Sequence, residues 1–522
     1  MQLKTFQFQI FKQYVYLALF VVLLRIAFRL VFDEVSWTSF TGAAIDGTKL
    51  AGWVLGFGFL NAWLDFRKLF KRSPAFLRTP ITALNISMAL TPEVARSVAR
   101  VRVASKLRAH RRGIHLVRSV LVPVFSNAID QAINLGDSMV SRGFGGAVFN
   151  SSTDGSVDLK NISFSYDRKT ILDNLSLKIP AGSLVLLAGN TGSGKSTLLK
   201  VIQARYPQAV YVNQFPRDSF VAATVFDELA FSLVQQGFSK SEVSMRVGEV
   251  AEKFELQELL KEDPHSLSAG WQQRLAIAAG LVSGSRLLLL DEPFSALDRS
   301  GSDLLRKLLS SLKRLGITIV IAEHRIDLLA DIVDDSFTLE GGRIKPGSPK
   351  FSSLKKPPNN KGLITVLMGA NGSGKTTHLR KLAETSGVLV PQPASDLLFL
   401  NTVGEELAQA DMDAKQSAGT TAQILEGLLG EFDQGQNPRD LSHGQKLALA
   451  ISAQLAKTTK LLMLDEPTLG FDLPARQALV ELLNRVSASG VEVLVATHDV
   501  GFADAIATRV QNISGGVISV VR

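Results

Sequence analysis

The strongest constraint on the fold is an internal repeat, because the same short motifs occur twice along the chain in the same order. The matched residues, at offsets of 180, 178, 174, 174 and 174 positions, are Lys195 and Lys375, Gln214 and Gln392, Ser268 and Ser442, Asp291 and Asp465, and His324 and His498. Offsets this constant predict two consecutive copies of one folding unit. The chain of 522 residues contains no cysteine, which excludes a disulfide framework, a cysteine-ligated metal and thiol catalysis.

The first motif of each copy is a glycine-rich loop between an apolar strand and a helix. GNTGSGKST follows SLVLLAG in the first copy, and GANGSGKTT follows LITVLMG in the second. In this context the glycines let backbone N–H groups curl around phosphate oxygens, the lysine reaches the terminal phosphates, and a hydroxyl can ligate magnesium. The residues expected to hold a nucleotide are Gly189, Asn190, Thr191, Gly192, Ser193, Gly194, Lys195, Ser196 and Thr197, and Gly369, Ala370, Asn371, Gly372, Ser373, Gly374, Lys375, Thr376 and Thr377.

An apolar strand in each copy ends in a pair of carboxylates, LLLLDEP at Asp291 and Glu292 and LLMLDEP at Asp465 and Glu466. An aspartate at such an end can hold magnesium, and the adjacent glutamate can orient or deprotonate an attacking water. We therefore expect Glu292 and Glu466 to be catalytic. The expected metal ligands are Ser196 with Asp291, and Thr376 with Asp465.

A third motif lies 23 residues before each aspartate and begins a helix, as LSAGW in the first copy and LSHGQ in the second. The N-terminus of a helix suits phosphate, because its backbone N–H groups are unpaired and its dipole favours negative charge. The residues expected to contact nucleotide here are Ser268 and Gly270, and Ser442, Gly444 and Gln445.

This ordered set of motifs resembles the ATP-binding cassette (ABC) family over residues 157–522. The resemblance implies an α/β P-loop NTPase fold with two ABC ATPase cassettes, and ATP and Mg²⁺ as cofactors. It implies head-to-tail pairing, with a first ATP site between the first Walker loop and LSHGQ and a second between the other Walker loop and LSAGW. The roles carried over are Tyr166 stacking on adenine, Gln214 and Gln392 as Q-loop glutamines at the metal, Asp298 and Asp472 as D-loop aspartates, and His324 and His498 contacting the γ-phosphate.

Two features depart from the family pattern. Trp271 stands where the signature motif usually has glutamine. The second cassette is preceded only by the linker PGSPKFSSLKKPPNNKG, with no tyrosine-bearing segment before its Walker strand. We therefore expect this cassette to lack an N-terminal β-subdomain, which predicts two unequal ATP sites.

The N-terminal part has a different charge balance from the rest of the chain. The first 150 residues carry 19 Lys/Arg and 7 Asp/Glu, whereas the remainder carries 38 and 41. This basic part also contains apolar runs at residues 14–32, 50–66 and 114–133, so it favours contact with a cytoplasmic membrane leaflet or a nucleic acid. Insertion of the first run is only marginally favourable because it contains Arg25 and Arg29. The alternative is that all three runs are buried helices of a soluble domain.

Residues 75–146 resemble the T component of energy-coupling-factor (ECF) importers, through a basic helix ending near LRAHRRG and the stretch LVPVFSNAIDQAINLGDSMVSRGFG. The segments after the two Q-loop glutamines, FPRDSFVAATVFDELAF and PASDLLFLNTVGEEL, look like those of ECF ATPases. The resemblance implies that two arginine-bearing helix ends, at residues 108–113 and 141–143, dock into the cassettes. The alternative for the basic helix is a solvated charged face.

The sequence thus predicts an all-α membrane and coupling-helix domain at residues 1–148, a first cassette at 157–345, a linker at 346–361 and a shortened second cassette at 362–522. The predicted function is the ATP-hydrolysing energy-coupling module of an ECF-type importer for a vitamin or metal ion, at the cell membrane with cytoplasmic ATPase domains. Expected partners are a separate substrate-binding membrane protein, a further transmembrane subunit and membrane lipid, and no nucleic acid.

The rival interpretation is a soluble twin-cassette ABC ATPase that binds nucleic acid or the ribosome through its basic N-terminus. Translation factors of that kind usually have a long helical linker between their cassettes, whereas this linker is short and rich in Pro and Lys. An exporter would need a full set of membrane helices, which we do not find in the sequence.

Overall fold

The computed structural model describes residues 154–520, with gaps at 167–168, 325, 348–353, 357–361 and 458–459, and before them residues 15, 18, 22, 45–52, 55–56 and 135–136. The chain divides into two compact units, Met1–Ser87 and Met88–Arg522. The described residues of the first unit are helical. No helix among the described residues is long and apolar enough to cross a membrane. Most of the three apolar runs, and both proposed coupling-helix ends, lie outside the described residues.

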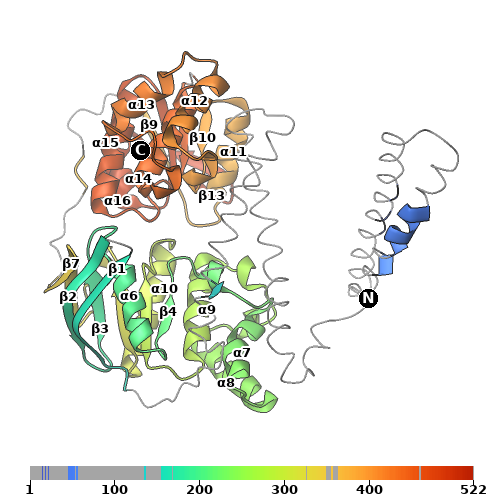
Figure 1. Cartoon of the computed structure of the whole chain (residues 1–522), viewed down its shortest axis with the longest axis vertical. Helices are drawn as coiled ribbons and strands as arrows, with labels where there is room; N and C mark the ends of the chain where they lie inside the picture. The colour runs from blue at the N-terminus through green and yellow to red at the C-terminus, as the bar shows by residue number, and fades with distance from the viewer. Residues whose placement is uncertain are drawn as a thin grey trace. The chain divides into compact units, whose positions relative to one another are not determined.

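The first cassette combines a small two-stranded sheet with a six-stranded sheet and its helices (Figure 1). Its strands are β1 (Val157–Tyr166), β2 (Lys169–Ile179), β3 (Leu184–Ala188), β4 (Val210–Val212), β5 (Leu287–Asp291), β6 (Thr318–Ala322), β7 (Asp335–Glu340) and β8 (Arg343–Pro346). Its α-helices are α6 (Lys195–Arg205), α7 (Val225–Gln235), α8 (Lys240–Lys253), α9 (Ala269–Leu281) and α10 (Arg299–Arg314). Short 3₁₀ segments are η2 (Pro216–Ser219), η3 (Gln257–Leu259), η4 (Pro264–Ser266) and η5 (Ile326–Leu328).

The second cassette repeats this plan from its Walker strand onward. Its strands are β9 (Ile364–Met368), β10 (Val388–Val390), β11 (Leu461–Asp465), β12 (Glu492–Thr497), β13 (Arg509–Ser514) and β14 (Val517–Val520). Its α-helices are α11 (Lys375–Thr385), α12 (Val403–Ala414), α13 (Thr420–Leu429), α14 (His443–Leu455), α15 (Leu473–Ala488) and α16 (Val500–Ile506), and its 3₁₀ segments are η6 (Ala394–Leu397) and η7 (Pro438–Asp440).

The two large sheets have the same strand order, β4-β5-β6-β3-β7-β8 and β10-β11-β12-β9-β13-β14. Neighbouring strands are parallel except for the last one of each sheet, which is antiparallel. The central strands read LVLLA, LLLLD and TIVIA in the first cassette, and all of these residues are buried. Continuous apolar runs are expected here, because helices cover both faces of such a sheet.

Strand direction explains why the motifs come together. The carboxyl ends of parallel strands lie at one edge of the sheet. Strands β5, β6 and β3, which precede three of the motifs, are neighbours in the strand order. The Walker loop, the paired carboxylates and the histidine of each cassette follow these strands directly. Ligands of open α/β sheets bind outside such strand ends.

The β1–β2 sheet distinguishes the two cassettes. Its strands are antiparallel and pack on the six-stranded sheet through residues such as Leu172 and Ile179. Figure 1 shows β1 and β2 at the opposite end of the first cassette from α7 and α8. The described residues between β8 and β9 contain no counterpart of this sheet. In the expected linker, Pro346 belongs to β8, and Lys355 exchanges two backbone hydrogen bonds with the Gln477 side chain of α15.

Candidate functional site

Each Walker loop wraps around its own lysine. Lys195 Nζ donates to the carbonyl oxygens of Gly189 at 2.7 Å and Asn190 at 3.0 Å. Lys375 makes the same two bonds, at 2.7 and 3.1 Å, in the second cassette. Burial lowers the pKa of the Lys195 ammonium, although nearby carboxylates act against this. The loop therefore holds a positive charge at the N-terminus of a helix, where phosphate is favoured.

Glycine is required where each loop joins its helix. Gly194 and Gly374 are the N-caps of α6 and α11, with φ of 101° and 99°. Side chains disfavour this left-handed region. At the start of the first loop a Cβ on Gly189 would lie 2.6 Å from the carbonyl oxygen of Leu339, so a side chain there would collide with backbone.

The paired carboxylates stand at the ends of β5 and β11. Asp291 and Asp465 are buried, and burial raises the pKa of both carboxyls. Their hydrogen-bond partners include the hydroxyls of Ser196 and Thr376, the residues that follow the Walker lysines. Asp465 Oδ1 has no hydrogen-bond partner among the described residues. A buried carboxylate oxygen beside a hydroxyl is the donor set that Mg²⁺ prefers, so these residues fit the metal.

Both expected catalytic glutamates have a strained backbone. Glu292 and Glu466 adopt φ of 44° and 45°, a left-handed conformation that costs a residue with a side chain about 1–3 kcal/mol. The N–H of each donates to the carbonyl of an alanine in the neighbouring strand, Ala322 or Ala496, at 2.8 Å. The sheet thus holds both carboxylates in one orientation. Such strain concentrates at functional positions.

The surroundings of the two glutamates differ. In the first cassette Gln214 Nε2 donates to Glu292 Oε2 at 2.9 Å, and His324 Nδ1 lies 3.8 Å from Glu292 Oε1. Gly470 of the other cassette also lies close to Gln214. A Cβ added to Gly470 would be 3.3 Å from Gln214 Nε2. His324 Nδ1 is closer, at 3.3 Å, to the buried carboxylate of Glu323.

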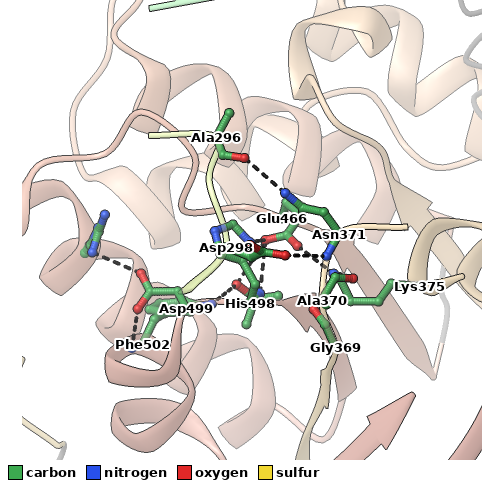
Figure 2. A network of polar contacts seen from close by, with 12 residues as sticks. Ala296, Asp298, Gly369, Ala370, Asn371, Lys375, Glu466, His498, Asp499 and Phe502 are labelled. Atoms are coloured by element: carbon green, nitrogen blue, oxygen red, sulfur yellow. Dashed lines mark hydrogen bonds and ion pairs between the residues drawn. The ribbon is translucent and has the colours of Figure 1, made fainter. Parts of the chain in front are cut away.

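In the second cassette Glu466 contacts a lysine and a histidine instead. Its Oε1 lies 3.3 Å from Lys375 Nζ, and its Oε2 lies 3.0 Å from His498 Nδ1 (Figure 2). Burial alone would raise the Glu466 pKa, but the hydrogen bond and charge of His498 and the charge of Lys375 outweigh it and lower the pKa. Gln392 is exposed, and the described residues show no hydrogen bond between its side chain and Glu466.

The D-loop aspartates bridge the cassettes. Oδ1 of Asp298 and of Asp472 accepts the N–H of the third residue of its own helix, α10 or α15, at 2.9 Å. Oδ2 of Asp472 accepts the N–H of Thr191 at 2.6 Å, and Oδ2 of Asp298 accepts the N–H of Asn371 at 3.3 Å. Asn371 Nδ2 also donates to the carbonyl of Ala296 at 3.1 Å, as Figure 2 shows. Each Walker loop is therefore contacted by the D-loop of the other cassette.

The two signature helices begin differently. Ser442 and Gln445 form a capping box at the start of α14, whereas the Ser268 side chain makes no capping hydrogen bond at the start of α9. Trp271 removes the reciprocal half of a capping box, because an indole has no acceptor for the backbone N–H of the N-cap residue. Its ring packs against the first core and under the Arg274 guanidinium, 5.0 Å from the ring centroid. Gly270 and Gly444 lie in the first turns of these helices.

Tyr166 ends β1 and remains available for a ligand. It is 52% exposed, and its ring meets that of Phe164 edge to face at a centroid distance of 5.0 Å. The neighbouring strand β2 touches the Walker loop, since a Cβ on Gly194 would lie 2.9 Å from Ile171 Cγ2. This arrangement is consistent with a stacking role at the first ATP site.

Replacing Tyr166 by alanine is expected to weaken ATP binding at the first site by about 1 kcal/mol or more, because an exposed aromatic face is lost. The second site should be barely affected. Nucleotide titrations of proteins with Lys195 or Lys375 replaced in turn will separate the two affinities. Equal weakening at both sites would contradict the assignment of Tyr166 to the first.

Three residues near the site carry no motif that sequence reasoning used. Tyr211 donates to Asp291 Oδ2 at 2.9 Å, Glu323 lies beside His324, and Arg476 reaches His324 from the second cassette. The first two stand at positions where the two copies differ, since Tyr211 aligns with Leu389 and Glu323 aligns with Thr497. VYVNQ in the first copy corresponds to VLVPQ in the second, and IAEH corresponds to VATH.

Family models match parts of both cassettes. The model described as "ABC transporter" matches residues 172–295, and the model described as "AAA domain, putative AbiEii toxin, Type IV TA system" matches residues 379–504. Curated relatives match more of the chain. A "Putative ABC transporter ATP-binding protein" of Streptomyces avermitilis is 27% identical over 69% of this chain and 93% of its own length. Proteins of the same description from Treponema denticola and Methanosarcina mazei are 27% and 25% identical over 69% of this chain and 96% and 94% of theirs.

Solved structures with similar folds include a "Model of ribosome-bound archaeal Pelota and ABCE1", with a TM-score of 0.49, 20% identity, and coverage of 69% of this chain and 78% of that one. A second is cbiO1 from Clostridium perfringens, described as part of the ABC transporter complex cbiONQ, with a TM-score of 0.34, 27% identity, and coverage of 36% and 86%.

The family models and relatives agree with the duplicated site. The chain carries two ABC ATPase domains, which bind ATP with Mg²⁺ and hydrolyse ATP. The roles of the individual residues stay predictions.

Proposed function

We propose that this chain is the ATP-hydrolysing energy-coupling module of an ECF-type importer for a vitamin or a metal ion, at the cell membrane with its cassettes on the cytoplasmic side. It acts with a separate substrate-binding membrane protein and a further transmembrane subunit. ATP binding closes the cassettes on each other, and hydrolysis with product release reopens them. Helices within residues 1–148 pass this motion to the membrane.

The observation that carries the proposal is a loop after each Q-loop that a buried glutamate holds in the same way in both cassettes. The fully buried Glu228 accepts the N–H groups of residues 221–222 at 2.9 and 2.8 Å. Glu406 is equally buried and accepts those of residues 399–400 in the second cassette. Each carboxylate fixes the segment that follows a short 3₁₀ turn, η2 or η6, and these segments are buried or half-buried. Phe215, directly before η2, is 39% exposed. A loop whose backbone is held by a buried carboxylate of its own cassette has a fixed shape, which suits the docking of a helix end.

The organisation of the chain supports the same proposal. The "Putative ABC transporter ATP-binding protein" of Streptomyces avermitilis is matched over 93% of its length by 69% of this chain, about the share that the two cassettes occupy. The first 150 residues add a basic, apolar part with 19 Lys/Arg against 7 Asp/Glu. A membrane-facing coupling domain fused to paired ATPases has these properties.

The chemistry at each site follows from the residues present. The Walker backbone and Lys195 orient the phosphates at the first site, and Glu292 orients the attacking water. Ser196 and Asp291 would hold Mg²⁺, which would neutralise charge on the phosphates. Asp472 ties the first Walker loop to the other cassette, so that the loop's geometry depends on cassette pairing.

Coupling is tested by reversing the charge of two arginines at the proposed helix ends. Arg112→Glu together with Arg142→Glu is expected to reduce ATP-driven uptake into membrane vesicles at least about tenfold, because a planar guanidinium binds carboxylates or helix-end carbonyls in fixed geometry. ATPase activity should persist, since these residues lie outside the Walker sites. Arg118→Glu reverses one charge away from the proposed helix ends and is the matched control for each single reversal, Arg112→Glu and Arg142→Glu.

The rival function predicts other results. A nucleic-acid-binding ATPase would lose RNA affinity in the double variant, and its salt dependence would fall by about one unit of slope per phosphate contact removed. Carbonate-washed membrane fractions and the proteins that co-purify with the chain distinguish the two. Normal uptake by the double variant, or absence of the chain from washed membranes, would overturn the importer proposal.

A further inference from the structure

Arg476 lies near the start of α15, at the contact between the cassettes, and touches three segments. Its Nε donates to the carbonyl of Phe471 at 3.0 Å, and its Nη1 lies 3.0 Å from Asp499 Oδ2. Its Nη2 lies 3.3 Å from Nε2 of His324 in the first cassette. The side chain is largely buried. Because all three guanidinium nitrogens are engaged, the plane of the group is fixed.

This contact defines which ring nitrogen of a neutral His324 carries the proton. A guanidinium can only donate hydrogen bonds, so Nε2 of His324 must accept from Arg476. The proton of a neutral imidazole then sits on Nδ1. Nδ1 faces the carboxylates of Glu323 at 3.3 Å and Glu292 at 3.8 Å. The ring is therefore held from both sides, by acidic groups of its own cassette and by an arginine of the other.

The second ATP site lacks the equivalent arginine. Ser302 corresponds to Arg476, because the N–H of each donates to the carbonyl of the D-loop aspartate four residues earlier, at 2.9 Å. Ser302 is buried, and its Oγ has no hydrogen-bond partner among the described residues. His498 is held instead through Nδ1, which lies 3.0 Å from Glu466. The two histidines of the repeat thus have different supports.

We infer that Arg476 is a positioning residue for the first ATP site, supplied by the second cassette, and that it holds the His324 imidazole in the Nδ1-protonated form. It acts through His324, which stands beside the water-orienting carboxylate of Glu292. Asp499 neutralises the arginine and follows His498 directly, so one side chain joins the histidine loops of both cassettes. This role concerns hydrolysis itself and does not depend on what the protein transports.

The kinetic test measures one site at a time in the full chain. Glu466→Gln leaves hydrolysis to the first site, and Glu292→Gln leaves it to the second. Arg476→Ala is expected to lower kcat of the first site at least about tenfold, because His324 is no longer held in position. KM for ATP should stay within about twofold. The loss at the first site should exceed that at the second at least about fivefold.

A spectroscopic test measures which nitrogen of the His324 imidazole is protonated. With ¹⁵N-labelled histidine, the Nδ1 and Nε2 signals of His324, identified by their disappearance in His324→Gln, should show the Nδ1-protonated form in the wild-type protein. Arg476→Ala should shift this ring towards a mixture of the two forms. The His498 signals should stay in place.

Two variants keep the inference falsifiable. Arg476→Lys preserves the charge beside Asp499 and the fold but cannot reach three partners, so it should show the same kinetic loss with an unchanged thermal midpoint. Ser302→Ala is the matched control at the equivalent position and should leave both sites unaffected. Equal losses at the two sites, full activity of Arg476→Lys, or an unaltered His324 spectrum in Arg476→Ala would overturn the inference. Loss of uptake alone would bear on the transport proposal and leave this one standing.

Discussion

A protein carrying both Glu292→Gln and Glu466→Gln is expected to bind ATP normally and to hydrolyse it at least about 100-fold more slowly than the wild type. Each glutamate stands at the end of a buried strand with its backbone fixed by a bond to the neighbouring strand. Glutamine keeps this shape and can still accept the hydrogen bonds, but it has no negative charge with which to orient or deprotonate water. Steady-state phosphate release and nucleotide binding measure the two properties separately.

Each single variant serves as the control for the other. A protein with only Glu292→Gln or only Glu466→Gln retains one complete pair of carboxylates and should keep measurable turnover. If the double variant hydrolyses ATP at the wild-type rate, these two residues do not perform the role predicted for them.

Replacing Asp465 by asparagine is expected to abolish Mg²⁺-dependent turnover at the second site and, unusually, to raise the thermal midpoint of the nucleotide-free protein at neutral pH. Burial raises the pKa of the Asp465 carboxyl, so the folded state favours its protonated form. Ionising the group in the folded state therefore costs free energy, and its Oδ1 has no hydrogen-bond partner among the described residues. Asparagine removes the charge and keeps an oxygen for the Thr376 hydroxyl.

The direction of the Asp465 pKa shift predicts how the stability of the variant depends on pH. A carboxyl whose pKa is raised on folding contributes stability below its ordinary pKa and loses that contribution as pH rises through the folded value. The advantage of Asp465→Asn should therefore grow between about pH 4 and neutral pH. Asp291→Asn is the matched control and should gain less, because Tyr211 already donates to the Asp291 carboxylate. A lower midpoint for Asp465→Asn throughout this range would contradict the explanation.

Local chemistry made much of the site predictable from the sequence. Gly194 and Gly374 adopt the left-handed conformation that a phosphate-binding loop needs, and no other residue type does so as easily. The strands before Asp291 and Asp465 are continuous apolar runs, so their buried position and parallel pairing follow from composition. Features of this kind depend on residues that are neighbours in the chain.

Contacts between distant segments were harder to predict. Gln214 and Gln392 occupy equivalent positions in the repeat, yet the structure shows only Gln214 bonded to its glutamate. Arg476 and His324 lie 152 positions apart and meet only because the cassettes touch. No periodicity or motif of one segment encodes such a meeting. The predicted membrane and coupling helices at residues 1–148 fall almost entirely outside the described residues, so their arrangement stays a prediction.

The two-oxygen arrangement at Asp298 and Asp472 has a consequence for repeated cycling. One oxygen of each carboxylate stays with its own helix, and only the other crosses to the opposite Walker loop. Separation of the cassettes therefore exchanges the hydrogen bonds that each aspartate accepts from the opposite loop for bonds to water, and bonds to a charged group contribute about 1.5–3 kcal/mol each. Neither α10 nor α15 loses its N-terminal cap in the process. The contact between the cassettes can therefore open and reform without fraying the helices that carry it, as an ATPase that resets after every turnover requires.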